Sequence, residues 1–443
     1  MSLSPCRSKT PVIERRQEEY LIFCPETTGC VRTNFVGALV YGLCDGRKIP
    51  SEIADVLSNL FSSPRNILLK EVTSFLTMLE NCRLISFDGP PRCQFAAVNH
   101  PVAIYLNLTN RCNLSCDFCC SDAGTRAEME MKTANVYNVV RQIGDLGCGE
   151  VILSGGEPLL RTDLIQIAEA CYDIGLRIHL ITNGLLMTRG IARQLARIHC
   201  SVQISIEGTD SAVDGCIRGN GAFEKTKNAV ELLKEEGINV AISPVVLRTN
   251  INDIPRMLDF ASEIGASSLQ LNRLVPAGRA HMNASRLAVE PEDFLRVLLI
   301  LSHQLSERQE KCSRVAVCDS WEALSIHEQS KRVPHPRSNC GFGAALLSIA
   351  PNGDVFPCHM LHVPDFKAGN ATTQKLGDIY SDSSVLSLCR EITVDTISQC
   401  KVCRYRHLCG GGCRADAYYN GNVRSQDSMC KVYRGFFDQV LWT

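Results

Sequence analysis

Three closely spaced cysteines follow an apolar, strand-like segment at residues 102–108. Cys112, Cys116 and Cys119 have the spacing CxxxCxxC. Three thiolates ligate three irons of a cubane 4Fe–4S cluster and leave the fourth iron without a protein ligand, so a small molecule can chelate that iron and be reduced there. In a chain with 24 cysteines, a zinc site or a chance grouping is the alternative.

A glycine-rich turn further along supports the cluster interpretation. The apolar segment at residues 151–153 runs into Ser-Gly-Gly-Glu-Pro, which contains Gly155, Gly156 and Glu157. Glycine lets the backbone approach a ligand closely, and proline ends the strand. A tight turn between a strand and a helix is the plain alternative, but the position one βα unit after the cysteines favours a ligand site. The two motifs together resemble the radical S-adenosylmethionine (SAM) superfamily.

This resemblance implies a chemistry and a set of contacts. Members of the superfamily cleave SAM reductively to methionine and a 5′-deoxyadenosyl radical, which abstracts a hydrogen atom. The three cysteines would hold the cluster that chelates SAM, and residues 155–157 would bind its methionyl amine. The other candidate SAM contacts are Phe118 at the adenine, and Ser205 and Glu207 at the ribose and methionine. Asn250, Arg273 and Arg279 are the candidates for the carboxylate, and for each of these three an ordinary solvated loop residue is the alternative.

Length and charge limit the class of protein. The 443 residues are long for one domain, and we expect two or three. A net charge of −1 gives no electrostatic footprint for nucleic acid or an anionic membrane, and no long apolar run predicts a membrane span. We therefore expect a cytoplasmic protein that binds neither. In that reducing compartment the cysteines favour metal ligation over disulfides.

Residues 96–310 alternate short apolar strands with amphipathic helices, which predicts α/β architecture with a parallel sheet. The resemblance implies an open, TIM-like (β/α)6 partial barrel, in which ligands collect at the C-terminal ends of the strands. The predicted strands are residues 102–108, 151–153, 177–181, 202–206, 240–246 and 269–274. The predicted helices are residues 136–146, 164–174, 191–198 and 223–236.

Residues 340–443 carry a second cysteine pattern, which resembles the SPASM domain and its two auxiliary 4Fe–4S clusters. Zinc is the competing metal, because CxxC pairs also build tetrahedral thiolate sites. The resemblance assigns Cys340, Cys358 and Cys413 to an inner cluster. It assigns the outer cluster to Cys400, Cys403, Cys409 and Cys430. Either Cys312 or Cys318, in a bridging region at residues 311–339, would complete the inner cluster. With the SAM-binding cluster and the two auxiliary clusters, the resemblance implies three 4Fe–4S clusters.

Residues 1–95 predict a hairpin at 20–24 and 29–33, three helices at 35–43, 51–61 and 68–82, and a short strand at 84–87. The pattern resembles the small peptide chaperone of pyrroloquinoline-quinone biosynthesis, a winged helix-turn-helix that serves as the recognition element for ribosomally made, modified peptides (RiPPs). Such modules add a leader peptide as a strand to the hairpin edge, where Val31 is the candidate contact. A DNA-binding winged helix is the alternative, but acidic and basic residues are nearly balanced here.

The resemblances together predict a radical SAM peptide maturase with a precursor peptide as substrate and a low-potential donor such as flavodoxin or ferredoxin. Thioether formation is our first expectation, followed by a carbon–carbon cross-link or a quinone-cofactor peptide. In sulfatase-maturing enzymes the general-base Asp directly follows the cysteine that corresponds to Cys358 of this chain. Here the next residue is His359, which is the candidate catalytic residue. A non-catalytic iron–sulfur sensor coupled to DNA is the alternative from another class.

Overall fold

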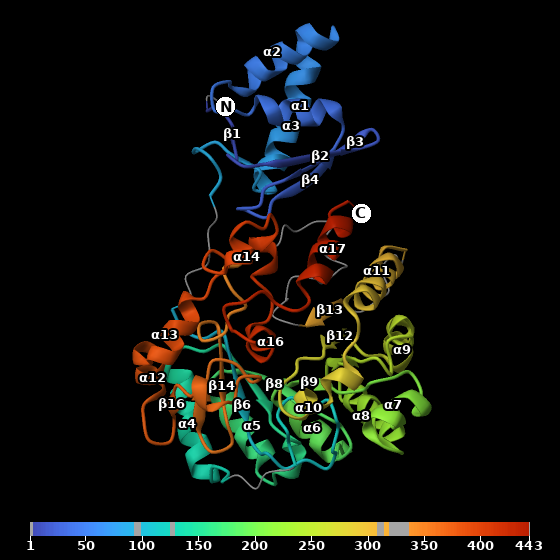
Figure 1. Ribbon diagram of the computed structural model, residues 1–443, viewed down its shortest axis with the longest axis vertical. Coiled ribbons are helices and arrows are strands. Elements are labelled where there is room, and N and C mark those ends of the chain that lie inside the picture. Colours follow the sequence, from blue (N-terminus) through green and yellow to red (C-terminus); the bar gives the residue numbers. More distant parts are fainter. Residues whose placement is uncertain (1–2, 93–98, 125–128, 308–313, 319–335, 443) are drawn as a thin grey trace.

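The computed structural model describes residues 3–92, 99–124, 129–307, 314–318 and 336–442. An N-terminal group of strands and helices lies at one end of the molecule. A sheet covered by helices forms the other end, and the C-terminal elements lie between them (Figure 1). The predicted α/β class with a central parallel sheet is confirmed. The predicted domain boundaries stay predictions.

The N-terminal elements combine a small antiparallel sheet with three helices. The sheet has the order β2 (Val12–Arg16), β3 (Glu19–Phe23), β4 (Cys30–Thr33), and β1 (Cys6–Arg7) pairs with β5 (Ile85–Ser86) in a separate ribbon. The helices are α1 (Phe35–Leu43), α2 (Pro50–Phe61) and α3 (Arg65–Asn81). The hairpin and all three helices match the sequence prediction, whereas β2 was not predicted.

The two faces of this sheet have different neighbours, because successive side chains point to opposite sides of a strand. Ile22 and Val31 face the three helices, where they pack in a small core with Tyr41. Phe23 faces away from these helices and joins the main core of the molecule, with its ring centroid 5.7 Å from that of Tyr405. The hairpin therefore lies between its own helices and the C-terminal elements.

The central sheet confirms the six predicted strands and their parallel order. From one side to the other it runs β12 (Ser268–Arg273), β10 (Val240–Ile242), β9 (Ser201–Ile204), β8 (Arg177–Thr182), β7 (Glu150–Ser154) and β6 (Ala103–Asn107). The predicted strand at 240–246 is broken, and its second half is β11 (Val245–Val246), which pairs farther along β12. Pro244 lies at the break and has no N–H to donate to a ladder.

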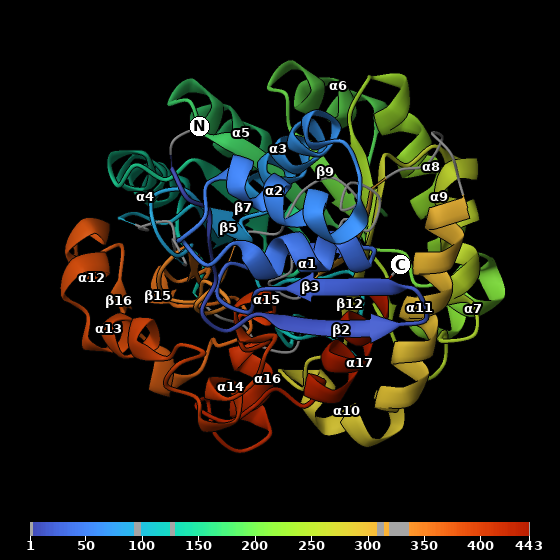
Figure 2. The same cartoon turned by 90° about the horizontal axis from the view of Figure 1, so that it is seen from above.

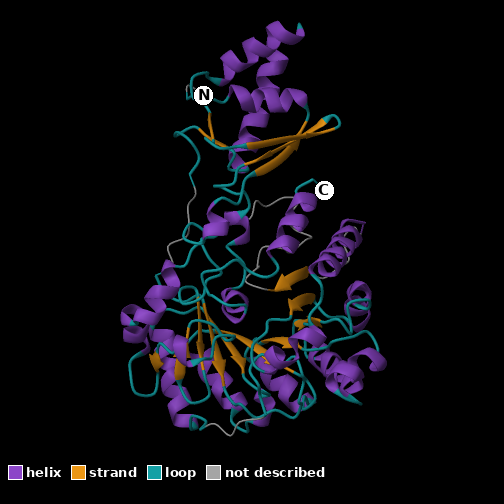
Figure 3. Ribbon diagram, in the orientation of Figure 1, coloured by secondary structure: helices purple, strands orange, loops and turns teal. Residues whose placement is uncertain are grey.

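Helices follow the strands along the chain and cover the outer face of the sheet (Figure 3). The four predicted helices are present as α4 (Thr133–Asp145), α5 (Leu164–Asp173), α6 (Arg189–Arg197) and α8 (Ala222–Glu235). The helices not predicted are α7 (Ser211–Arg218), α9 (Met257–Ile264), α10 (Arg279–Leu287) and α11 (Pro291–Glu307). Within the described ranges, every helix is too short or too polar to cross a membrane.

The C-terminal elements extend the sheet before they leave it. Strand β13 (Arg314–Cys318) pairs in parallel with β12, and β14 (Leu346–Ile349) pairs in parallel with β6. Strands β15 (Asp354–Phe356) and β16 (Gly369–Asn370) continue antiparallel from β14. The remaining helices are α12 (Leu376–Asp382), α13 (Ser384–Glu391), α14 (Ser398–Lys401), α15 (Arg406–Cys409), α16 (Arg414–Tyr419) and α17 (Cys430–Val440).

The C-terminal end of α17 meets the N-terminal sheet, as Figures 1 and 2 show from two directions. Arg404 pairs with both Glu14 of β2 and Asp438 of α17. Arg32 of β4 donates from Nη1 to the carbonyl of Trp442 at 2.8 Å. The N-terminal sheet and the C-terminal block therefore share an interface that combines these polar contacts with the apolar contact of Phe23 and Tyr405.

Candidate active site

The loop that carries Cys112, Cys116 and Cys119 leaves the C-terminal end of β6 and is held by Arg279 of α10. The Arg279 guanidinium donates to the carbonyls of Cys116 at 3.0 Å and Ala123 at 2.7 Å. The same side chain lies 3.1 Å from Asp122. The contacts of these described donors all go to the cluster loop, and the prediction that Arg279 binds the SAM carboxylate stays untested.

The three cysteine thiols of this loop are close enough to influence one another. Burial, together with the charges of Glu207, Cys119 and Cys112, raises the pKa of Cys116 to about 12, and the charge of Arg218 opposes the shift. A thiol must lose its proton to ligate iron, so these neighbours suit a site in which a positively charged metal group replaces the protons. Among the residues described, no three Cys, His, Asp or Glu side chains are placed to hold a single metal ion. Phe118, which lies between Cys116 and Cys119 in the sequence, is partly buried.

The two glycines at the end of β7 are required by a close approach of two backbone segments. A Cβ at Gly155 would lie 2.4 Å from the Thr109 carbonyl oxygen, and one at Gly156 would lie 2.2 Å from that of Arg111. The Gly156 N–H also donates to the Thr109 carbonyl at 2.7 Å. The glycines therefore press the end of β7 against the chain that leads into the cysteine loop.

Glu157 is buried and ties the ends of β7 and β8 together. Its carboxylate accepts from Thr182 Oγ1 at 2.6 Å, from the Asn183 N–H at 2.8 Å and from the Leu159 N–H at 3.0 Å. Burial raises its pKa, and these donors oppose that shift. The prediction that Glu157 binds the SAM amine stays open, but the donors show that its carboxylate already has a structural task.

Glu207 follows β9, and its side chain is fully buried. Its Oε2 accepts from the Val245 N–H at 2.6 Å, while its buried Oε1 has no hydrogen-bond partner in the described protein. Burial raises the pKa of Glu207 to about 8, and the charge of Arg218 opposes that shift. A buried carboxylate with an unmatched oxygen close to the cysteine loop fits a site that receives a hydrogen-bond donor from a cofactor.

Two residues near Glu207, Asn250 and Arg218, support the strand ends. Asn250 donates from Nδ2 to the carbonyls of Glu207 at 2.8 Å and Val245 at 2.9 Å, and its Oδ1 accepts from Leu247. Arg218, which sequence reasoning missed, donates to the Ser205 carbonyl and to the Asn183 carbonyl, the latter at 3.0 Å. The Ser205 and Asn250 predictions stay untested, although the described amide contacts of Asn250 all go to backbone.

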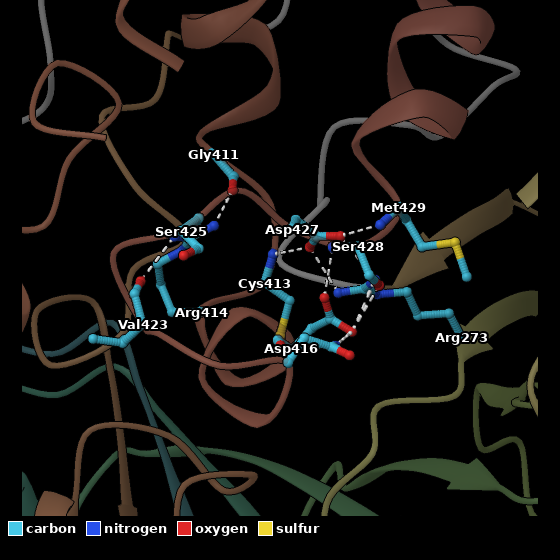
Figure 4. Close-up of polar contacts among 11 residues, drawn as sticks. Arg273, Gly411, Cys413, Arg414, Asp416, Val423, Ser425, Asp427, Ser428 and Met429 are labelled. Carbon is cyan, nitrogen blue, oxygen red and sulfur yellow. Dashed lines mark hydrogen bonds and ion pairs between the residues drawn. The ribbon is translucent and has the colours of Figure 1, made fainter. Parts of the chain in front are cut away.

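Arg273, at the end of β12, is held by two acidic side chains, and its predicted contact with the SAM carboxylate stays untested. Its two terminal nitrogens lie 2.9 and 2.7 Å from the carboxylate oxygens of Asp427, and Nη1 lies 3.6 Å from Asp416 (Figure 4). All three side chains are buried. Two acidic residues far away in the sequence therefore hold the guanidinium that was predicted to bind the SAM carboxylate. No local signal identifies such partners.

The cysteines assigned to the outer cluster lie near one another. Burial raises the pKa of Cys400 to about 11; Arg414 opposes the shift, and the neighbouring Cys430 and Cys403 add to it. Burial also raises the pKa of Cys409, with the charge of Asp427 next in importance. This grouping fits the predicted ligand set.

The cysteines assigned to the inner cluster share one apolar surrounding. Cys413 is a buried member of it, and Cys340 and Cys358 pack against it. For the predicted fourth ligand, Cys318 ends β13 opposite Asn272 of β12, and its side chain lies outside the described residues. Cys312 also lies outside them. The choice between the two stays a prediction.

His359 lies in the turn after β15, next to groups that sequence reasoning missed. Its ring stacks on Tyr105 of β6 with centroids 4.2 Å apart, and its Nδ1 lies 4.0 Å from the Cys358 sulfur. Nearby, His362 Nε2 lies 2.8 Å from Ser348 Oγ. Burial lowers the pKa of His359 to about 4, so its imidazole is neutral at physiological pH. The signal that could have found Tyr105 is the alternation of β6, because Tyr105 points to the opposite face of the sheet from its buried neighbours Ile104 and Leu106.

Comparison with known proteins agrees with this geometry. Residues 106–261 match the Radical SAM superfamily, residues 340–404 match the SPASM iron–sulfur cluster-binding domain, and residues 19–85 match coenzyme PQQ synthesis protein D (PqqD). The chain is 30% identical over 356 residues to the AdoMet-dependent heme synthase of Methanosarcina barkeri, covering 76% of this chain and 98% of the relative. It is 28% identical over 343 residues to a PqqA peptide cyclase of Methylobacterium sp., covering 75% of this chain and 86% of the relative.

A solved structure extends the likeness to nearly the whole chain. SuiB of Streptococcus suis, bound to its precursor peptide SuiA, superposes with a TM-score of 0.62 at 17% identity, over 96% of this chain and 100% of that one. At this identity the match shows a shared fold. The site and the fold thus define an enzyme with a SAM-cleaving barrel and an auxiliary iron–sulfur domain. The chain belongs to the radical SAM superfamily and carries SPASM and PqqD-like regions.

Proposed function

We propose that this enzyme matures a ribosomally made precursor peptide by installing a cross-link, with a thioether as the favoured product. The observation that carries the proposal is the PqqD-like match over residues 19–85, joined in one chain to the radical SAM barrel. The PqqA peptide cyclase relative acts on a peptide by its name, and SuiB has been solved with a precursor peptide. A domain that holds the leader next to the barrel would raise the effective concentration of the segment to be modified.

The edge of β4 supports leader binding by strand addition. Within the described chain, β4 has β3 on one side and no strand on the other. The Cys24 N–H donates to the Gly29 carbonyl at 2.8 Å, so the alternation of antiparallel pairs makes Ile22 and Val31 a hydrogen-bonded pair. The backbone groups of Val31 therefore face β3. Those of Cys30 and Arg32 point outward, where a leader strand would pair, whereas the Val31 side chain faces the helices.

The barrel residues support the chemistry. Cys112, Cys116 and Cys119 would hold the SAM-binding cluster, and the SPASM cysteines would hold two auxiliary clusters. Bound SAM supplies the abstraction of a hydrogen atom from a carbon of the peptide. An auxiliary cluster held by the C-terminal cysteines would accept the remaining electron when a peptide thiol loses its proton and forms the S–C bond of a thioether. The protein's own part would be to fix the strand ends through Glu157. His359, whose imidazole is neutral, would be the group that accepts the thiol proton.

The decisive experiment is anaerobic turnover of the full-length enzyme with SAM, a flavodoxin or ferredoxin reducing system, and a precursor peptide, which is to be sought among short Cys-rich products of the genes beside this one. We expect 5′-deoxyadenosine and a peptide that has lost two hydrogens. Alkylation before and after turnover separates a thioether, which consumes a free thiol, from a carbon–carbon link, which does not. A peptide that stays unmodified while SAM is cleaved would contradict the proposal.

Heme formation is the second candidate, because the heme synthase is 30% identical and aligned over 98% of its length. About a quarter of this chain lies outside that alignment, which covers 76% of it. The PqqD-like match favours a peptide substrate for the complete chain. Turnover with a tetrapyrrole in place of the peptide tests this candidate directly, with heme absorbance as the readout.

A further inference from the structure

The strongest unexplained feature is the buried acidic pair that faces Arg273 across the boundary between β12 and the C-terminal cysteines (Figure 4). Asp427 lies between two ligand-bearing segments. Its Oδ2 accepts from the Cys413 N–H at 2.5 Å, and its Oδ1 accepts from the N–H of Met429, the residue before Cys430, at 2.7 Å. One carboxylate thus orients segments predicted to ligate both auxiliary clusters.

The loop between Cys409 and Cys413 is pressed against the same carboxylate. A Cβ at Gly412 would lie 2.5 Å from Asp427 Oδ2, so only glycine allows this approach. Asp427 is 2% exposed and Arg273 is 4% exposed, and the guanidinium binds the carboxylate through two nitrogens. The charge of Asp427 contributes to the raised pKa of Cys400, Cys409 and Cys430, which places it near three of the four predicted outer ligands.

A buried ion pair is a weak source of stability, because desolvation offsets most of its attraction. Its charge is nevertheless felt strongly by a neighbouring metal group, because the surroundings screen it little. Reduction adds one negative charge to a cluster. A nearby carboxylate makes that step less favourable, and a guanidinium that pairs with the carboxylate offsets the effect.

We propose that Arg273 and Asp427 are positioning residues that set the reduction potential of the outer auxiliary cluster. Arg273 belongs to the barrel and Asp427 to the C-terminal block, so the pair also joins the sheet to the cluster ligands. The proposal rests on the outer ligand assignment and not on the identity of the substrate.

The test is potentiometric EPR of the reconstituted full-length enzyme without peptide. Asp427→Asn keeps the shape of the side chain and removes its charge, so we expect the outer-cluster potential to shift positively. Asp416→Asn is the matched control. It removes a charge from the same buried group, but Asp416 bonds to Ser428 and Asn420 rather than to a ligand amide. We expect a smaller shift from it.

Arg273→Gln provides a test that does not depend on the stability of the Asp427 variant. It leaves the Asp427 bonds to Cys413 and Met429 in place and removes the compensating charge, so the potential should shift negatively. Unchanged potentials in both variants overturn the proposal, as does an equal shift from Asp416→Asn. Iron and zinc analysis of the wild type separates the two claims: a zinc-filled C-terminal block refutes the ligand assignment, whereas loaded clusters with unmoved potentials refute only the role of the pair.

Discussion

At the scale of single residues, Glu157 illustrates how a motif residue can serve the fold and the site together. Its carboxylate accepts three hydrogen bonds that join the ends of β7 and β8, so its orientation is fixed before any ligand binds. The sequence identified Glu157 by its place after two glycines. The partners could not be predicted, because Thr182 and Asn183 come to this position only when the parallel strands align.

We predict that Glu157→Gln lowers the free energy of unfolding by roughly 1–3 kcal/mol, because an amide NH2 would face donors that now meet a carboxylate. SAM cleavage should fall with it, since the end of β7 also packs against the cysteine loop. Anaerobic thermal unfolding and 5′-deoxyadenosine assays measure the two effects. Glu235→Gln is the control, because its ion pair with Arg189 is exposed and such changes usually cost about 0.5 kcal/mol or less. Equal stability of the two variants would contradict the prediction.

At the scale of elements, the periodicity of apolar residues predicted those strands and helices that are set by their own sequence. The six barrel strands, four of their helices and the N-terminal hairpin were all found from apolar periodicity. Strand β2 was missed because Glu14, Arg15 and Arg16 give it a charged sequence, and it is a strand only because β3 pairs with it. The cysteine ligand assignments could be made from spacing, and they stay predictions. The Arg273–Asp427 pair could not be predicted, because it joins residues that only the tertiary fold brings together.

The register of β4 leads to a prediction about leader binding. Arg32→Pro removes an outward N–H, so it should abolish binding of the leader while the hairpin stays paired. Val31→Pro removes an N–H that faces β3, and it should destabilise the hairpin itself. Fluorescence anisotropy of a labelled precursor and thermal unfolding separate these effects.

The control for Arg32→Pro is Arg32→Ala, which also loses the side-chain bond to the Trp442 carbonyl but keeps the backbone donor. The alanine variant should bind the leader nearly as well as the wild type. Should both Arg32 variants lose binding equally, the side chain and not the strand edge would be the contact.

At the scale of the whole molecule, the expected clusters are distributed over two regions that can be separated by mutation. Replacing Cys112, Cys116 and Cys119 together with Ala should abolish SAM cleavage and remove about a third of the roughly twelve irons that three cubanes hold. The cysteines of the C-terminal block are unaffected by these changes, so their iron should stay. Anaerobic iron and sulfide analysis measures the loss. Cys216→Ala, at an exposed cysteine outside both motifs, is the control and should retain all the iron.

The interface between the first and last elements leads to the final prediction. Arg404 pairs with Glu14 and Asp438, the Arg16 guanidinium lies 4.5 Å from the centre of the Trp442 ring, and Phe23 packs with Tyr405. Deleting residues 1–95 would therefore uncover apolar surface of the C-terminal block, and a point variant is the cleaner test.

Arg404→Met keeps the bulk of the side chain and leaves both carboxylates without this partner. We expect it to bind the leader normally and to cleave SAM normally. Peptide modification should fall, because the leader domain is no longer held in one position relative to the barrel. Limited proteolysis should also become faster near residues 12–16.

The matched control is Arg248→Met, which breaks an exposed ion pair with Glu290 on the barrel. If Arg404→Met modifies the precursor at the rate of that control, the interface has no part in presenting the peptide to the barrel.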